Sequence, residues 1–295
     1  MDNIDQRIRR KDEHTMKNTF KLLYGILIFL AAEAIQLFSI IILKMVYGVY
    51  VGFCLGGNAS NNNVYRGVID EAISHNVLYM ISTIGVCVCG IAFFFWFKYE
   101  TSGEFGSNVG CIMNAKPISL LIFMGIGCQF LFNGIVNIFL KYLSKLYIDY
   151  KVEMDKLTKG NTVIVILLLV VIAPITEELI FRGVLLHYAR KYIKFCGANL
   201  FQAFLFGLYH WNILQGLYAA VMGLLLGYIC YKFKTVMASI ILHVIINASA
   251  ILVNLFSDYY INYIIFIFAG GTILFITFNR IKKLNLLYAY VTDAK

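Results

Sequence analysis

Apolar residues form runs of about 20 along nearly the whole chain, and short polar segments separate the runs. A helix needs about 20 apolar residues to cross a hydrocarbon core of about 30 Å, whereas a membrane β-strand leaves a weaker, alternating pattern. The runs therefore predict an all-α, polytopic membrane protein with about eight transmembrane helices in a bundle. The expected spans are at about 20–44, 74–98, 117–140, 161–190, 197–212, 215–231, 235–256 and 260–279.

The polar segments between the runs are short and do not indicate a second globular domain. The chain is instead expected to divide into four consecutive parts. These are a cytoplasmic basic tail at 1–19, N-terminal transmembrane helices and loops at 20–160, a core of helices that carries the polar motifs described below at 161–256, and a last transmembrane helix with a basic C-terminal tail at 257–295.

The composition agrees with a membrane protein and narrows the expected partners. Of the 295 residues, 60% are hydrophobic and only 14% are charged, and the mean hydropathy is +0.77. The net charge is +9, but the cations lie between the apolar runs and at both ends, where lipid headgroups account for them. The lipid bilayer is therefore an expected partner, and nucleic acid is not.

The distribution of lysine and arginine predicts how the chain is oriented. Cations gather in the N-terminal tail, in alternate loops and in the C-terminal tail, so the positive-inside rule predicts cytoplasmic N- and C-termini. The link at 141–160 opposes this orientation with its own lysines, and an amphipathic stretch on the membrane surface is expected to account for them. The low proline content and the many lysines and isoleucines favour a bacterial plasma membrane.

The stretch "PITEELIFRG" at 174–183 places three charged residues at the end of an apolar run. A charged side chain near the bilayer centre costs at least about 2.5–3.5 kcal/mol, so such residues are candidates for function. Glu178 and Arg182 are four residues apart and can pair on one helix face, which leaves Glu177 about 100° round the helix. Pro174 is expected to kink the helix and free backbone carbonyls.

Two further polar motifs lie on later apolar runs. His210 follows Phe206 by four residues in "FGLYH", and His243 shares one helix face with Asn247 in "HVIIN". Four other polar residues within apolar runs are expected to hydrogen-bond between helices: Glu33, Gln36, Asn133 and Asn137.

A carboxylate, two imidazoles and an amide inside a membrane suit two kinds of hydrolytic chemistry. A glutamate and a histidine can deprotonate a water molecule, while a second histidine and an asparagine stabilise an oxyanion. Alternatively, Glu177, His210 and His243 could hold a zinc ion that activates the water. The chain has no H-E-x-x-H motif, so such ligands would have to come from three helices.

The three motifs, in this order and each on its own helix, resemble those of the CAAX-protease and bacteriocin-processing (CPBP or Abi) family of intramembrane endopeptidases, which is similar to type II CAAX prenyl proteases. The resemblance covers about 170–250. The matching residues are Glu177, Glu178 and Arg182 for E-E-x-x-x-R, Phe206 and His210 for F-x-x-x-H, and His243 and Asn247 for H-x-x-x-N.

The resemblance implies a helix bundle that encloses a catalytic cavity and an endopeptidase activity on a membrane-associated peptide. It implies that Glu177 and His210 activate the water and that His243 and Asn247 form the oxyanion site. Glu178, Arg182 and Phe206 would support these groups. No cofactor is expected to be required, with zinc as the alternative.

Three other interpretations fit the same motifs. The polar residues could only hold helices together, or the protein could be a non-catalytic family member that acts in bacteriocin immunity or peptide binding. A proton-coupled transporter is the third, although only one proline-broken helix is visible. For the endopeptidase, the expected substrate is a peptide or protein, either lipid-modified or a leader peptide.

Overall fold

The computed structural model shows how the chain folds over most of its length. It describes residues 2–56, 75–101, 112, 114–140, 148, 152, 162–255 and 263–284. The link at 141–160, apart from residues 148 and 152, lies outside the described residues, so its placement on the membrane surface stays a prediction.

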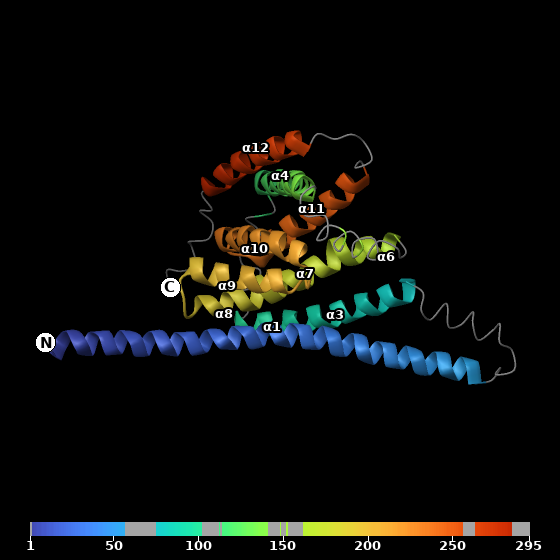
Figure 1. The fold of residues 1–295 in the computed structure, drawn as a ribbon, viewed down its shortest axis with the longest axis horizontal. Helices are drawn as coiled ribbons and strands as arrows, with labels where there is room; N and C mark the ends of the chain where they lie inside the picture. The colour runs from blue at the N-terminus through green and yellow to red at the C-terminus, as the bar shows by residue number, and fades with distance from the viewer. Residues whose placement is uncertain are drawn as a thin grey trace.

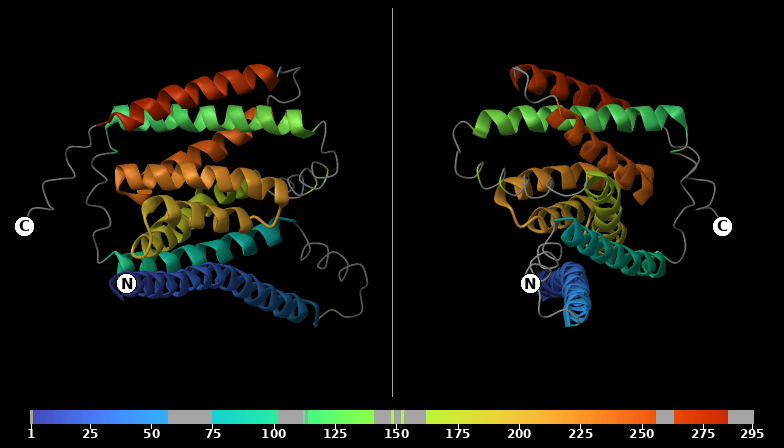
Figure 2. Two further views of the ribbon diagram at one scale, coloured as in Figure 1. Left: turned by 60° about the vertical axis from the view of Figure 1, so that its left-hand side comes forward. Right: turned by 90° about the vertical axis from the view of Figure 1, so that its right-hand side faces the viewer.

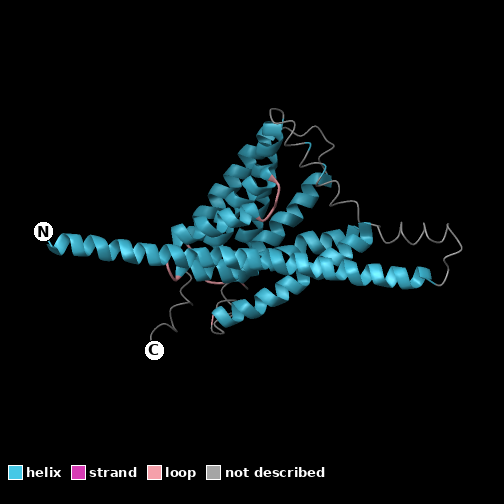
Figure 3. Cartoon of the chain, turned by 60° about the horizontal axis from the view of Figure 1, so that its bottom comes forward, coloured by secondary structure: helices cyan, strands magenta, loops and turns pink. Residues whose placement is uncertain are grey.

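All regular elements in the described ranges are helices, as Figure 3 shows, and the predicted all-α class is confirmed. The first three are α1 (Asp2–Gly56), α3 (His75–Glu100) and α4 (Ala115–Leu140). A broken helix follows, composed of α6 (Thr162–Ile166), η2 (Leu167–Ile172), α7 (Ala173–Glu178), η3 (Leu179–Leu186) and α8 (His187–Arg190). The last four are α9 (Phe195–Leu208), α10 (Ile213–Phe233), α11 (Val236–Leu255) and α12 (Tyr263–Lys282).

Seven helices within the described residues are long and apolar enough to cross a membrane, which confirms a polytopic membrane protein. The fifth of the eight expected spans is shorter than predicted. In place of 197–212 the structure has α9, whose 14 residues reach about 21 Å and do not cover a core of about 30 Å.

The first helix is longer than the predicted span at 20–44. The α-helix begins at Asp2, so the segment expected as a tail at 1–19 is helical, and the apolar part that could cross a membrane is Leu23–Phe53. Figure 3 shows this helix extending past the rest of the bundle at its N-terminal end.

The helices are arranged so that the broken helix lies in the interior. Helices α4 and α12 pack together on one side, α1 and α3 pack on the other, and the broken helix, α9, α10 and α11 lie between them (Figures 1 and 2). The largest hydrophobic cluster occupies this middle region and includes Phe93, Phe181, Phe206 and Leu242. The polar motifs of the sequence are therefore carried by the central helices.

The break near Pro174 is a change in helix type. The two stretches η2 and η3 are π-helical and flank α7, which has Pro174 in its first turn. The Ala173 N–H donates to the Leu168 carbonyl, five residues back, rather than to Leu169. The Leu169 carbonyl instead accepts a hydrogen bond of 2.8 Å from Asn247 Nδ2 on α11. The sequence-based expectation of a freed carbonyl is confirmed, and its partner comes from another helix.

Helices α9 and α10 form a close hairpin in which small residues let the backbones approach. A Cβ atom added at Gly207 would lie 2.7 Å from the Gly216 carbonyl oxygen, and one added at Gly223 would lie 3.0 Å from Ala203 Cα. Such contacts are typical of helix pairs in membranes. The turn between the two helices carries His210, just after the C-terminal end of α9 and before α10.

Replacing Gly227 with alanine is expected to destabilise this hairpin. The added Cβ would lie 1.9 Å from Asn199 Oδ1 and 2.8 Å from Gln202 Nε2, so both buried amides would have to move. We expect a loss of about 1–3 kcal/mol in the free energy of unfolding, seen as a lower midpoint of thermal unfolding in detergent. Gly271→Ala on α12 is the control, because its Cβ would meet nothing within 4 Å. Equal losses in the two variants would contradict the prediction.

Candidate active site

A fully buried ion pair lies at the centre of the bundle. Arg182 Nη1 donates to Glu178 Oε1 over 2.7 Å, and neither side chain is exposed. This is the pairing that the spacing of four residues predicted. Arg182 Nη2 also donates to the Gly223 carbonyl of α10 over 3.2 Å, and its guanidinium carbon lies 4.5 Å from the centre of the Phe206 ring. The pair therefore connects the broken helix to both α9 and α10.

His243 of α11 lies between the two glutamates. Its Nδ1 is 2.9 Å from Glu178 Oε1 and its Nε2 is 3.7 Å from Glu177 Oε2. Because Arg182 holds Glu178 as a hydrogen-bond acceptor, the hydrogen of this bond belongs to His243 Nδ1. The bond orients the ring and directs Nε2 toward Glu177.

Glu177 is the carboxylate that a water molecule can reach. Its side chain is 14% exposed, whereas that of Glu178 is 0% exposed. The difference follows from their places on the helix: adjacent residues point about 100° apart, so Glu178 faces Arg182 and Glu177 faces the edge of the buried cluster. Glu178 therefore bonds to Arg182 and His243 in the interior, and Glu177 is the more exposed of the two carboxylates.

His210 sits just after the end of α9 and is held by its own helix. Its Nδ1 lies 2.8 Å from the Phe206 carbonyl oxygen, which can only accept, so Nδ1 carries the hydrogen and neutral His210 presents a lone pair on Nε2. No hydrogen bond or ion pair joins His210 to Glu177 among the described residues. Cooperation between these two groups, as the family resemblance implies, would have to pass through a bound water.

Phe206 forms the packing surface between the two histidines. Its ring is buried, with the His210 ring centre at 4.9 Å and the His243 ring centre at 5.9 Å, both in edge-to-face geometry. Arg182 lies against the same aromatic ring. Phe206 therefore packs against Arg182 and both histidine rings.

Asn247 lies one helical turn after His243 on α11. One hydrogen of its amide nitrogen is used by the Leu169 carbonyl, so the other remains for a second acceptor. The freed carbonyl of the π-helical stretch thus fixes the orientation of the Asn247 amide.

Two buried amides extend the polar network and were not singled out from the sequence. Gln202 Nε2 donates to Asn199 Oδ1 over 2.8 Å and to the Gly223 carbonyl over 2.9 Å, and Asn199 Nδ2 donates to the Leu224 carbonyl over 3.0 Å. The Gly223 carbonyl therefore accepts from both Gln202 and Arg182. The signal was present as two amides three residues apart in the apolar stretch "NLFQAF".

Helix α1 contacts the turn that contains His210, through the residues on either side of it. Trp211 Nε1 donates to Glu33 Oε2 over 3.3 Å, and Gln36 Nε2 donates to the Tyr209 hydroxyl. Trp211 has a left-handed backbone with φ of 52°, which a non-glycine residue adopts only when its surroundings enforce it. The predicted inter-helix hydrogen bonds of Glu33 and Gln36 are confirmed.

For the asparagines of α4, the hydrogen bonds found within the described ranges are local. Asn137 Nδ2 donates to the Asn133 carbonyl over 2.9 Å and to Asn133 Oδ1 over 3.0 Å, both within one helix. A spacing of four residues lets the two amides satisfy each other locally, so no second helix is needed.

The residues were also compared with what a zinc ion requires. Across the described ranges, no group of three or more His, Cys, Asp or Glu side chains is placed to hold a metal ion. The alternative ligand set of Glu177, His210 and His243 therefore does not converge as these side chains stand.

A bundle of long apolar helices around a buried Glu–Arg–His cluster defines a multi-pass membrane protein with an intramembrane polar site. Residues 159–249 match the family model described as Type II CAAX prenyl endopeptidase Rce1-like, so this segment is a domain of that family. The matched segment contains all three motifs, and the resemblance stated from them is confirmed. Searches of curated proteins and of solved structures gave no match.

Removing one member of the buried ion pair is expected to destabilise the bundle more than removing both charges. Arg182→Met leaves the buried Glu178 carboxylate without its cation and should lower the free energy of unfolding by about 3–5 kcal/mol. The double variant Arg182→Met/Glu178→Gln removes the uncompensated charge and should recover part of this loss. Unfolding in mixed detergents measures both variants, and a double variant less stable than Arg182→Met would contradict the prediction.

Proposed function

We propose that this protein is an intramembrane endopeptidase that hydrolyses a peptide bond in a membrane-associated peptide or protein. The observation that carries the proposal is the position of Glu177: a partly exposed carboxylate 3.7 Å from an imidazole that a fully buried Glu178–Arg182 pair orients. This geometry lies within a domain of an endopeptidase family. Hydrolysis by an activated water is the reaction that such a set of groups supports.

The reaction begins with a water molecule bound at Glu177. Glu177 takes one proton from this water, and the His210 Nε2 lone pair accepts a hydrogen bond from the remaining O–H. The water oxygen forms a bond to the carbonyl carbon of the substrate, and the electron pair of the C=O bond moves to the oxygen. Glu177 then returns its proton to the leaving nitrogen as the C–N bond breaks, which leaves a carboxylic acid and an amine.

The negative oxygen of the intermediate needs donors, and α11 supplies them in this proposal. Protonated His243 donates from Nε2, because its Nδ1 hydrogen is already bound by Glu178. The second amide hydrogen of Asn247 is the other donor, because the first is bound by the Leu169 carbonyl. Removing one donor of this kind typically lowers kcat by about 10²–10³-fold.

Three residues in this scheme do not contact the substrate and act by positioning the catalytic groups. Glu178 fixes the His243 ring, Arg182 balances the charge of Glu178, and Phe206 packs against both histidine rings. They are positioning residues, because their contacts are with the proposed catalytic groups.

The short α9 supports a site within the depth of the membrane. Its N-terminal end follows the cations Arg190, Lys191 and Lys194, which belong at the level of the lipid headgroups. Its length of about 21 Å then leaves the opposite end, with His210, inside a hydrocarbon core of about 30 Å. A substrate that is itself held in the membrane, such as a lipid-modified peptide or a leader peptide, fits this depth.

For the location in the cell we propose a bacterial plasma membrane with both termini in the cytoplasm. The first residues of α1 and the last residues of α12 lie at the same side of the bundle (Figure 2), which supports a common compartment for the two ends. The cations of the N-terminal tail and of the C-terminal region support the cytoplasm as that compartment.

Glu177→Gln and His210→Ala are expected to abolish cleavage. Each change removes a group that handles a proton of the water, so the rate should fall by at least about 10²-fold. Purified protein in detergent or liposomes is incubated with a prenylated C-a-a-X peptide and with an unmodified membrane peptide, and the products are measured by mass spectrometry. Glu100→Gln is the matched control. Glu100 pairs with Lys191 in the turn between α8 and α9 and lies outside the polar cluster. Cleavage that persists in Glu177→Gln or His210→Ala, with intact folding, would overturn the assignment.

Chelation of divalent metals is expected to leave cleavage unchanged, because the proposed water activation uses side chains only. The cleavage rate is measured three times. The first measurement is on untreated protein, the second follows treatment with a zinc-binding chelator that is then removed, and the third follows addition of zinc. Loss on chelation followed by recovery with zinc would favour the alternative, in which Glu177, His210 and His243 move together to bind the metal. Metal analysis of the purified protein provides the control.

A further inference from the structure

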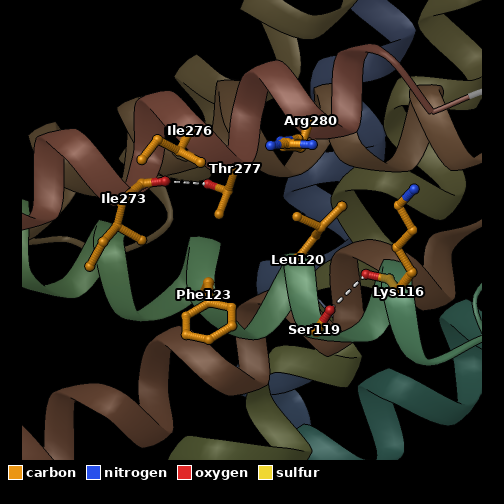
Figure 4. A pocket seen from close by; sticks show the side chains of 8 residues that line it. All are labelled: Lys116, Ser119, Leu120, Phe123, Ile273, Ile276, Thr277 and Arg280. Atoms are coloured by element: carbon orange, nitrogen blue, oxygen red, sulfur yellow. Dashed lines mark hydrogen bonds between the residues drawn. The ribbon is translucent and has the colours of Figure 1, made fainter.

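A groove of about 360 Å³ lies between α4 and α12, away from the polar cluster, and Figure 4 shows the side chains that line it. Helix α4 contributes four of them and α12 contributes the other four. They are Lys116, Ser119, Leu120 and Phe123 from α4, and Ile273, Ile276, Thr277 and Arg280 from α12. The α4–α12 pair forms an outer layer of the bundle, so this groove lies where lipid surrounds the protein (Figure 2).

The two helices approach most closely at glycines in the C-terminal half of α4 and the N-terminal half of α12. A Cβ atom added at Gly270 would lie 2.4 Å from the Leu131 nitrogen and 2.7 Å from the Gly127 carbonyl oxygen, so the backbones are in direct contact there. Toward the N-terminal end of α4, the facing positions carry Phe123 and Ile276 in place of glycine. The larger side chains line an open space between the helices.

The lining divides into a cationic end and an apolar end. Lys116 is in the first turn of α4 and Arg280 is in the last turn of α12, so both lie at span ends and on the same side of the bundle. Both are exposed, and neither forms an ion pair with an acid within the described residues. Phe123 and Ile276 are 56% and 51% exposed and lie farther along the spans, about 10 Å from Lys116 in the case of Phe123.

This division of charge matches one kind of molecule in a membrane. A phospholipid has a phosphate at the headgroup level and acyl chains that begin a few ångströms deeper, and basic pockets between transmembrane helices bind anionic headgroups. Two cations against a phosphate also form charge-assisted hydrogen bonds. A zwitterionic lipid offers the same phosphate with a nearby positive charge, which the cations repel, so an anionic lipid fits better.

We propose that the α4–α12 groove binds an anionic phospholipid. Lys116 and Arg280 bind its phosphate from opposite helices, and Leu120, Phe123 and Ile276 contact an acyl chain. The Ser119 hydroxyl donates to a backbone carbonyl of its own helix and is partly exposed, so its oxygen can accept from a headgroup hydroxyl, whereas Thr277 is buried and bonds only within α12. The site does not depend on the endopeptidase function.

Native mass spectrometry of the full-length protein tests this site. The protein is released from detergent in the presence of phosphatidylglycerol or of phosphatidylcholine with the same acyl chains. We expect at least threefold more bound phosphatidylglycerol, and we expect the double variant Lys116→Gln/Arg280→Gln to lose this preference. Both side chains are exposed, so the variant should fold, which thermal unfolding checks.

A second double variant serves as the matched control. Lys98→Gln/Lys194→Gln removes two exposed cations from the same side of the bundle and should keep the preference for phosphatidylglycerol. Phe123→Asp introduces a charge where the acyl chain lies and should reduce binding of both lipids at this site. Equal binding of the two lipids by the unaltered protein, or an equal loss of preference in both double variants, would overturn the proposal. Displacement of the lipid by inorganic phosphate alone, at millimolar concentration, would identify a simple anion site and would also overturn it.

Discussion

The buried pair of Glu178 and Arg182 is the interaction on which the arrangement of the central helices depends. Burying two charges in a hydrocarbon environment is costly, and contacts with neighbouring helices offset part of that cost. His243 bonds to Glu178, the Gly223 carbonyl accepts from Arg182, and the Phe206 ring lies against the guanidinium; these contacts come from α11, α10 and α9. Glu178 Oε2 and Arg182 Nε have no hydrogen-bond partner within the described part of the chain. Three helices are thus placed around one ion pair, and moving any of them would leave a charged group without its neighbour.

The second constraint comes from Pro174, which cannot donate a backbone hydrogen bond. The π-helical stretch before it shifts the Ala173 bond back to Leu168, and the Leu169 carbonyl becomes available for Asn247. The break in the backbone hydrogen bonds therefore also affects another helix, since it fixes the orientation of the Asn247 amide on α11. Glu177 and Glu178 follow the proline within the same short segment, so the break and the carboxylates are positioned together.

Local spacing predicted two features of the broken helix correctly. The Glu178–Arg182 pair follows from a separation of four residues, and the freed carbonyl follows from the proline. Contacts between helices depend on how each helix is rotated and shifted against its neighbours, which periodicity does not encode. For that reason the approach of His243 to Glu177, the network of Gln202 and Asn199, and the short α9 emerged only from the folded structure. The Asn133–Asn137 bond shows the converse, a local solution where a long-range one was predicted.

The contacts of α1 show that the first helix supports the candidate site. The family match begins at residue 159, yet the turn that contains His210 is contacted by Glu33 and Gln36, which belong to the first helix. The segment that matches the family model is therefore smaller than the part of the protein that supports the site. Excised alone, the matched segment would lose the hydrogen-bond partners of Trp211 and Tyr209, so transferring this domain to another protein requires the first helix as well.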